Sequence, residues 1–206
     1  IHSFPTRRSS DLYMDKEMGN IVLSIDGRKE VNDNTRIRVN GSGTYDAILP
    51  KIKEMVDKRD KSKQYYVRGT FTRDNTDFYY DVKHLADLGF EEVSVEPVVL
   101  PDEHELSLRE EDLPTIFENY DLLYKDMLKR YEENREFKFY HFNIDLQGGP
   151  CVYKRISGCG AGHEYIAVTP DGEIYPCHQF VGNEDFKIGT IYDEDEKLNL
   201  DRKSVV

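Results

Sequence analysis

The stretch GGPCVYKRISGCGAGHEYIAVTPDGEIYPCHQFVG, residues 148–182, carries all three cysteines of this 206-residue chain. These are Cys151, Cys159 and Cys177, and each lies close to a glycine or a proline. In the second half of the stretch, EYIAVTPDGEIYPC has two segments of alternating apolar residues joined by the turn PDG, which predicts a β-hairpin. Because a hairpin returns the chain to its start, we expect Cys177 to fold back toward the loop that carries the other two cysteines.

Three thiolates on converging loops predict an iron–sulfur cluster or a zinc ion. Buried structural thiols are the alternative, because cysteine packs like a small apolar residue, but scattered cysteines would suit that role better. Disulfide bonds are disfavoured, since the number of cysteines is odd and no segment resembles a secretory signal. A tetrahedral metal site needs four ligands, and three cysteines supply only three. A fourth ligand therefore comes from elsewhere, or the open coordination position has a function.

Histidines are weaker candidates for the same site. His163 lies in the loop beside the cysteines and is the better spare ligand, although a structural role is favoured for it. His178 follows Cys177 directly, so on a strand it would point to the opposite face, unless the strand has already ended. His84 and His104 are predicted to lie on the surface.

The cysteine spacing resembles that of a known family. The pattern C-x12-G-x4-C between Cys159 and Cys177, followed by aromatic-rich sequence, resembles the start of a SPASM domain. This domain is the auxiliary cluster-binding module of many radical S-adenosylmethionine (radical SAM) enzymes. The wider stretch from FNIDLQGGPC to CHQFVG, residues 142–182, resembles one branch, the maturases that install thioether crosslinks in short cysteine-rich SCIFF peptides. The resemblance extends from about Met18 to Asp193.

Upstream of the cysteines the chain alternates between strand and helix patterns. Three β-α units in series predict a parallel sheet with helices packed outside it, and such sheets bind ligands at the C-terminal ends of their strands. Those ends carry Ser24, Asp26, Arg68, Thr70 and Glu96. The expected strands are 21–26, 64–72 and 91–100, and the expected helices are 45–59, 77–88 and 113–134.

The resemblance implies that these units are the C-terminal half of a radical SAM (β/α)6 partial barrel, followed by the start of a SPASM domain. The string SIDG, which begins at Ser24, resembles the family's S-x-D-G signature. By that resemblance Ser24 approaches the methionyl end of S-adenosylmethionine, and Asp26 faces the substrate side. Arg68 would clasp the cofactor's carboxylate, and the last strand, with Glu96, would border the adenine. A simple strand-to-turn ending at Ser24 and Asp26, and a surface salt bridge at Arg68, are the alternatives.

Several motifs of the family do not occur in this sequence. It lacks the C-x3-C-x2-C that holds the radical-generating cluster, the G-G-E stretch, and the C-x2-C-x5-C-x3-C of a complete SPASM domain. The chain is therefore interpreted as an internal fragment that does not cleave S-adenosylmethionine by itself. The ends, IHSFPTRRSSDL and RKSVV, resemble translated sequencing-adapter sequence, and the first has no periodic hydrophobicity. The expected division is a tail at 1–12, the partial barrel at 13–142, the SPASM part at 143–200 and a tail at 201–206.

The resemblance implies a peptide maturase with two kinds of cofactor, S-adenosylmethionine and 4Fe–4S clusters. Its implied partners are a short cysteine-rich precursor peptide and a reductant such as a ferredoxin or flavodoxin. Cys151, Cys159 and Cys177 would bind the auxiliary cluster. Another SPASM maturase, for example a sulfatase-maturing enzyme, and a non-catalytic zinc-binding module stay open as alternatives.

Composition limits the partners. The net charge of −12 disfavours nucleic acid and anionic membranes, although an acidic surface suits a basic leader peptide. No segment approaches the roughly 20 apolar residues of a membrane span, and we expect a cytoplasmic location.

Overall fold

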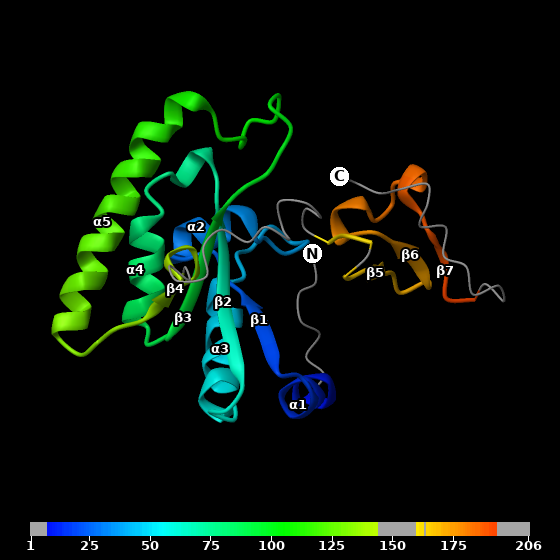
Figure 1. The fold of residues 1–206 in the computed structure, drawn as a ribbon, viewed down its shortest axis with the longest axis horizontal. Coiled ribbons are helices and arrows are strands. Elements are labelled where there is room, and N and C mark those ends of the chain that lie inside the picture. The colour runs from blue at the N-terminus through cyan, green and yellow to red at the C-terminus, as the bar shows by residue number, and fades with distance from the viewer. Residues whose placement is uncertain (1–7, 144–159, 163, 193–206) are drawn as a thin grey trace. The chain divides into compact units, whose positions relative to one another are not determined.

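The computed structural model describes residues 8–143, 160–162 and 164–192. The chain divides into two compact units, Ile1–Ile144 and Asp145–Val206 (Figure 1). The finer domain boundaries expected from the sequence stay predictions.

The first unit is a parallel β-sheet with helices. Its strands are β1 (Asn20–Ser24), β2 (Gln64–Phe71), β3 (Glu92–Pro97) and β4 (Lys138–Phe139), and its helices are α1 (Arg8–Glu17), α2 (Lys29–Thr35), α3 (Tyr45–Lys58), α4 (Tyr79–Asp87) and α5 (Leu113–Glu132). All the strands are parallel, in the order β1-β2-β3-β4. The three expected β-α units are confirmed. Helices α1 and α2 and strand β4 are additional, and β3 ends at Pro97, three residues before its expected end, although the N–H of Val98 still donates to the carbonyl of Phe71 at 2.9 Å.

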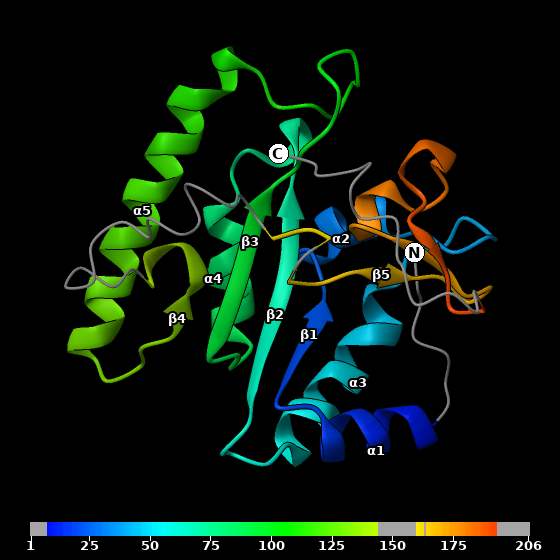
Figure 2. The same ribbon diagram turned by 45° about the vertical axis from the view of Figure 1, so that its right-hand side comes forward.

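The two faces of this sheet differ in chemistry. Successive side chains along a strand point to opposite faces. Val67, Phe71 and Val93 are buried on the face where α3, α4 and α5 pack (Figure 2). Val22 and Arg68 lie on the other face and are exposed; we call it the open face. Parallel sheets are normally buried on both faces, so an open polar face is what half of a barrel presents.

A buried ion pair holds the loop that follows β1. The side chain of Asp81, on α4, is fully buried and accepts hydrogen bonds from Nε of Arg28 at 2.8 Å and from its backbone N–H at 2.9 Å. Arg28 also donates to Asp77 at 2.8 Å. Just before Arg28, Gly27 has a φ of +131°, a conformation that only glycine adopts readily. The loop therefore depends on both the ion pair and the glycine.

Replacing Arg28 with alanine is expected to destabilise the protein by about 3 kcal/mol at neutral pH, because the Asp81 carboxylate stays buried without its cation. Burial raises the pKa of Asp81, and the hydrogen bonds from Arg28 oppose that rise. In the Arg28→Ala protein, Asp81 therefore keeps its proton in the folded state at pH values at which it has already lost it in the unfolded state. Stability should therefore fall as pH rises from the ordinary carboxyl pKa of about 4 toward the raised value. Urea unfolding across this pH range measures the effect.

Lys29→Ala provides the matched control for this prediction. Lys29 pairs with Asp46, but both side chains are exposed, so the pair contributes little to stability. The control should unfold at nearly the wild-type urea concentration at each pH. An Arg28→Ala protein that is as stable as this control would show that Asp81 does not need its partner.

The second unit contains a small antiparallel sheet in its described residues. Its strands are β5 (Ala167–Val168), β6 (Glu173–Tyr175) and β7 (Gly189–Thr190), in that order. The predicted hairpin is confirmed: the N–H of Gly172 donates to the carbonyl of Thr169 at 2.9 Å, and Gly172 has a left-handed φ of +84°. Strand β7 is not predicted from the sequence, because a strand of two residues is too short to show the alternation of apolar and polar side chains.

Helix α1 begins inside the segment 1–12, in which no apolar period is evident. Contacts at its end hold it: the buried guanidinium of Arg59 donates to the carbonyls of Met18 at 3.1 Å and Gly19 at 3.0 Å. Lys63 donates to the carbonyl of Asp15 at 2.6 Å. The adapter-like origin of residues 1–12 stays a prediction.

The surface position predicted for His84 is wrong. His84 is half-buried between α3 and α4, and its Nε2 lies 2.6 Å from the hydroxyl of Tyr45. Burial lowers the pKa of His84. His104 is exposed, as predicted.

Candidate functional site

The residues predicted for the cofactor site meet at one edge of the sheet. Ser24 lies beside Arg68 in the strand register, and Arg68 lies beside Ser94. Two residues further along the strands, Thr70 lies beside Glu96. Because side chains two residues apart share a face, the structure brings Ser24, Arg68 and Glu96 together on the open face, near the C-terminal ends of β1, β2 and β3.

Arg68 and Glu96 form an ion pair with two hydrogen bonds. Nε of Arg68 donates to Oε1 of Glu96 at 3.0 Å, and Nη2 donates to Oε2. The hydroxyl of Ser94 also donates to Oε1, at 3.0 Å. The bond from Arg68 lowers the pKa of Glu96, so the carboxylate is an anion. Both partners are partly exposed, and such pairs contribute only up to about 1 kcal/mol. The alternative of a surface salt bridge at Arg68 therefore describes this structure, and a ligand's carboxylate could replace Glu96 at small cost.

Asp26 links α2 to β2 by hydrogen bonds. Its buried carboxylate accepts hydrogen bonds from Arg36 at 2.6 and 2.9 Å. It also accepts from the hydroxyl of Thr35 at 3.1 Å and from the backbone N–H of Thr70 at 3.0 Å. These bonds tie the end of α2 to the end of β2. The substrate-facing role of Asp26 stays a prediction.

Aromatic side chains lie beside Arg68 and Glu96, and this position is not predicted from the sequence. The ring of Tyr140, directly after β4, meets the ring of Tyr66 edge to face, with centroids 5.7 Å apart. Nδ1 of the next residue, His141, lies 2.8 Å from the hydroxyl of Tyr120. Burial lowers the pKa of His141, and the charge of Glu96 opposes this only in part. The string FKFYHF indicates aromatic packing, but the two-residue strand that positions it has no recognisable period.

Cys177 is the described member of the predicted cluster site. It is only 6% exposed and is a free thiol. Strand β6 ends at Tyr175, and a 3₁₀ helix begins at His178. The strand has thus ended before Cys177, so the argument that placed His178 on the opposite face does not apply. The Sγ of Cys177 lies 3.5 Å from Nδ1 of His178, whose side chain is exposed.

The turn before Cys177 folds back onto the segment that follows Cys159. The N–H of Gly162 is shared between the carbonyl of Pro176 at 3.0 Å and that of Tyr165 at 2.9 Å. This contact brings the turn before Cys177 to the segment that follows Cys159, as expected from the hairpin, and a cysteine thiol is a donor that suits an iron–sulfur cluster or zinc. That the three cysteines meet stays a prediction. Cys151, Cys159 and His163 lie outside the described residues, and within the described ranges no three potential ligands gather.

Comparison with known proteins supports this arrangement. The family model of SPASM, an iron–sulfur cluster-binding domain, matches residues 159–199. A cysteine-type anaerobic sulfatase-maturating enzyme from Clostridium novyi (strain NT) is 29% identical over 182 residues, which cover 83% of this chain and 46% of that enzyme.

Two solved structures share the fold. The structure of anSMEcpe with bound AdoMet has a TM-score of 0.70 at 18% identity, over 96% of this chain and 54% of the other. SuiB from Streptococcus suis, bound to S-adenosylmethionine, has a TM-score of 0.52 at 14% identity, over 96% of this chain and 47% of the other. The chain therefore spans about half the length of the relatives it matches.

These findings define the class of fold. The predicted α/β fold is confirmed: the parallel sheet with its helices has the fold of the solved radical SAM structures above, and residues 159–199, which include the hairpin, match the SPASM model. The particular likeness to SCIFF maturases stays a prediction, and the curated relative above belongs to the alternative class of sulfatase maturases.

Proposed function

We propose that this chain is part of an enzyme that uses S-adenosylmethionine and iron–sulfur clusters to modify a cysteine-containing peptide. One observation carries the proposal: a parallel sheet with an open face, and with Ser24 and Arg68 at the edge where such sheets bind ligands, is followed in the same chain by a match to a cluster-binding domain. The solved relatives support a peptide partner, since anSMEcpe has also been determined with bound AdoMet and the Kp18Cys peptide.

In this proposal the open face binds S-adenosylmethionine. Arg68 exchanges its partly exposed partner Glu96 for the methionyl carboxylate, because a guanidinium suits paired hydrogen bonds to a carboxylate. Ser24, exposed beside it, adds a hydroxyl. Once reduced, S-adenosylmethionine supplies the radical chemistry. The sequence lacks the motif for the reducing cluster, so we propose that these 206 residues alone are inactive.

The auxiliary 4Fe–4S cluster is proposed for Cys151, Cys159 and Cys177. A thiol that coordinates metal is deprotonated and fixed in place. The burial of Cys177 would shield its sulfur from water. The fourth position is left for a residue outside this chain or for a thiol of the peptide.

The finer activity that we propose is a thioether crosslink between a cysteine and a carbon of the same short peptide. The sequence from 142 to 182 supports it. Sulfatase maturation is the second candidate, supported by the enzyme from Clostridium novyi. A ferredoxin or flavodoxin is proposed as the electron donor, and the cytoplasm as the location. None of the helices in the described ranges has the length and apolar character of a membrane span.

The test is a peptide-modification assay with the intact protein that carries this chain, loaded with iron and sulfide under anaerobic conditions. A short cysteine-rich peptide and a sulfatase-derived cysteine peptide are each incubated with S-adenosylmethionine and a reductant. If a thioether crosslink forms, the peptide loses two hydrogens but keeps its sulfur, and the crosslinked cysteine can no longer be alkylated. A change that is confined to one cysteine residue supports sulfatase maturation instead. Unchanged peptides, with zinc rather than iron in the protein, would refute both and indicate a zinc-binding module.

A further inference from the structure

Helix α5 carries a second row of apolar side chains besides the one that it packs into the core. A surface helix of a globular protein normally has one apolar face and a polar face opposite it. The buried apolar residues of α5 are Ile116 and Leu123. Five other large apolar side chains of this helix stay 42% to 71% exposed, and they are Leu113, Phe117, Tyr124, Leu128 and Tyr131. We call these five residues the α5 stripe.

The α5 stripe is continuous along the helix. At about 100° per residue, its five members fall within about 60° of the helix circumference, roughly a quarter of a turn from Ile116 and Leu123. From Leu113 to Tyr131 it spans about 27 Å. Figures 1 and 2 show α5 at the outer edge of the first unit, with α4 on its inner side. Exposed apolar surface that is contiguous and rich in aromatic side chains marks an interaction surface.

Charged residues beside the stripe are arranged for pairing with a second copy of α5. On the side of the stripe away from the core, Glu118 and Asp121 lie in the first half of the helix, and Lys125 and Lys129 lie in the second half. If two copies of α5 lie antiparallel about residue 123, Asp121 of each comes opposite Lys125 of the other. Glu118 then comes opposite Lys129. A parallel pair would bring like charges together, so the charges favour the antiparallel arrangement.

These charged side chains are available for such a contact. All four are exposed. Within the described part of the chain, Glu118, Asp121 and Lys125 form no ion pair, and Lys129 only approaches Glu133, at 3.9 Å. A second copy can therefore pair with them without breaking a short ion pair of the first.

The stripe is large enough for a weak dimer. An aromatic side chain buries about 150–250 Å² when it is fully covered, so these five partly exposed side chains offer roughly 500 Å² per copy. Two copies would bury about 1,000 Å² together, which is the lower limit for a specific interface. Because interfaces of this size are weak, we expect a dissociation constant on the order of 10 µM.

We propose that two copies of this protein associate through an antiparallel pair of α5 helices. The contact is twofold symmetric, so one self-complementary patch serves both copies. Tyr124 lies near the symmetry axis, beside Tyr124 of the second copy. Phe117 packs against Leu128 and Tyr131 of the second copy, and the rows of charge pair along the rim.

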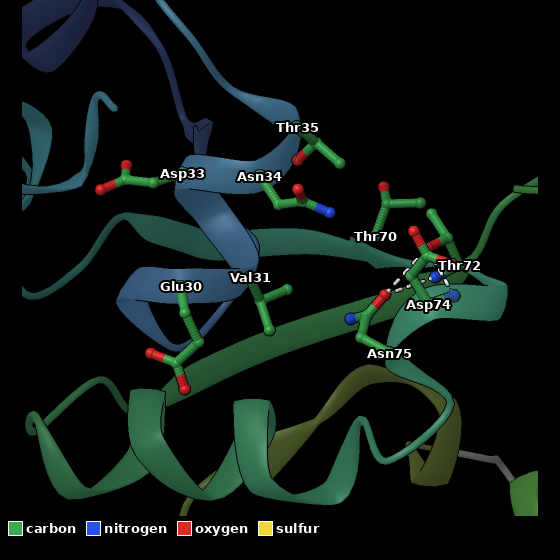
Figure 3. Close-up of a pocket in the computed structure, with 9 residues that line it drawn as sticks. All are labelled: Glu30, Val31, Asp33, Asn34, Thr35, Thr70, Thr72, Asp74 and Asn75. Atoms are coloured by element: carbon green, nitrogen blue, oxygen red, sulfur yellow. Dashed lines mark hydrogen bonds between the residues drawn. The ribbon is translucent and has the colours of Figure 1, made fainter. Parts of the chain in front are cut away.

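This association leaves the edge of the sheet where ligands bind accessible. Helix α5 packs on the face opposite the open face. The cavity of about 400 Å³ at the C-terminal edge lies between α2, the end of β2 and the 3₁₀ helix Arg73–Asn75 (Figure 3). Helix α5 contributes none of the described residues of its wall. The association needs neither S-adenosylmethionine nor a peptide, so it is independent of the proposed function.

Sedimentation velocity of the intact protein that carries this chain, at concentrations from about 1 to 200 µM, tests the proposal. The protein should sediment as a monomer at the low end of this range and as a dimer at the high end. Tyr124→Asp should weaken the dimer at least about tenfold, because it places two unpaired carboxylates side by side in an apolar contact. Tyr124 is exposed in the single copy, so the variant should stay folded, which circular dichroism verifies.

Val99→Asp is the matched control, because Val99 is also exposed but lies outside α5. It should dimerise like the unchanged protein. The charge pairs have their own test: Asp121→Lys should weaken the dimer, and adding Lys125→Asp to it should restore the dimer. Restoration requires the antiparallel register, since only there do these two positions face each other.

A monomer at the highest concentration would overturn the inference. So would a dimer that Tyr124→Asp leaves unchanged, or one that Val99→Asp weakens equally. A monomer whose unfolding midpoint falls in the Tyr124→Asp variant would also overturn it, because the stripe would then be covered by another part of the same protein. If the double charge variant stays as weak as Asp121→Lys, the antiparallel pair is wrong.

Discussion

Replacing Cys177 with alanine is expected to remove the auxiliary cluster, and with it about four iron atoms and four sulfides per chain. Under the proposed function only three thiolates of this chain hold that cluster, so two remain in the variant. Alanine takes the place of a small buried side chain, and the unit should therefore stay folded. Iron and acid-labile sulfide are measured per intact protein chain after anaerobic reconstitution, and circular dichroism verifies the fold.

His178→Ala is the matched control for the loss of iron. Its imidazole is exposed, yet its Nδ1 lies only 3.5 Å from the Sγ of Cys177. The control should keep its full content of iron and sulfide. Full iron in the Cys177→Ala protein would contradict the proposed ligand set. Equal losses in the two variants would instead make His178 a ligand.

Strands β1, β2 and β3 and helices α3, α4 and α5 could be predicted because their own sequences are apolar or have an apolar period. The bounds of β1, β2 and α3 lie within two residues of those expected. Helix α2 could not be predicted, since KEVNDNT contains one apolar residue and no helical stripe. It is held by contacts that form only on folding, such as the hydrogen bonds that Oδ1 of Asp33 accepts from the N–H groups of Thr44 and Tyr45, both at 2.8 Å.

The positions of the candidate residues in the fold could be predicted from the sequence, but their contacts could not, and their role in binding stays a prediction. Strand ends place Ser24, Arg68 and Glu96 on one edge, and the predicted turn returns Pro176, the residue before Cys177, to Gly162. That Glu96 pairs with Arg68 depends on side-chain conformation across two strands. The partner of Asp26 is Arg36, ten residues later, and the path of α2 alone brings it there. A signature such as S-x-D-G thus predicts where in the fold a site would lie, but it does not predict the contacts that its side chains make.

Gly27→Ala is expected to destabilise the protein by about 3 kcal/mol or more, enough to unfold many domains of marginal stability. Two costs add at this position. The φ of +131° is strained for any residue with a Cβ. A Cβ would also lie 2.3 Å from the Cβ of Asp81, so the loop or α4 must move, and the ion pair of Arg28 with Asp81 would be disturbed. The midpoint of urea unfolding and the soluble yield of the intact protein measure the effect.

Two other glycines separate these costs. Gly41 has a φ of +80°, and no atom lies within 4 Å of the position that a Cβ would take there, so Gly41→Ala carries the backbone cost alone, about 1 kcal/mol. Gly19 has open space and no positive φ, so Gly19→Ala should be neutral or slightly stabilising. If the Gly27→Ala protein were no less stable than the Gly41→Ala protein, Asp81 would be able to move away from the added Cβ at little cost in free energy. The loop after β1 would then owe its shape to the backbone of Gly27 and not to its packing against α4.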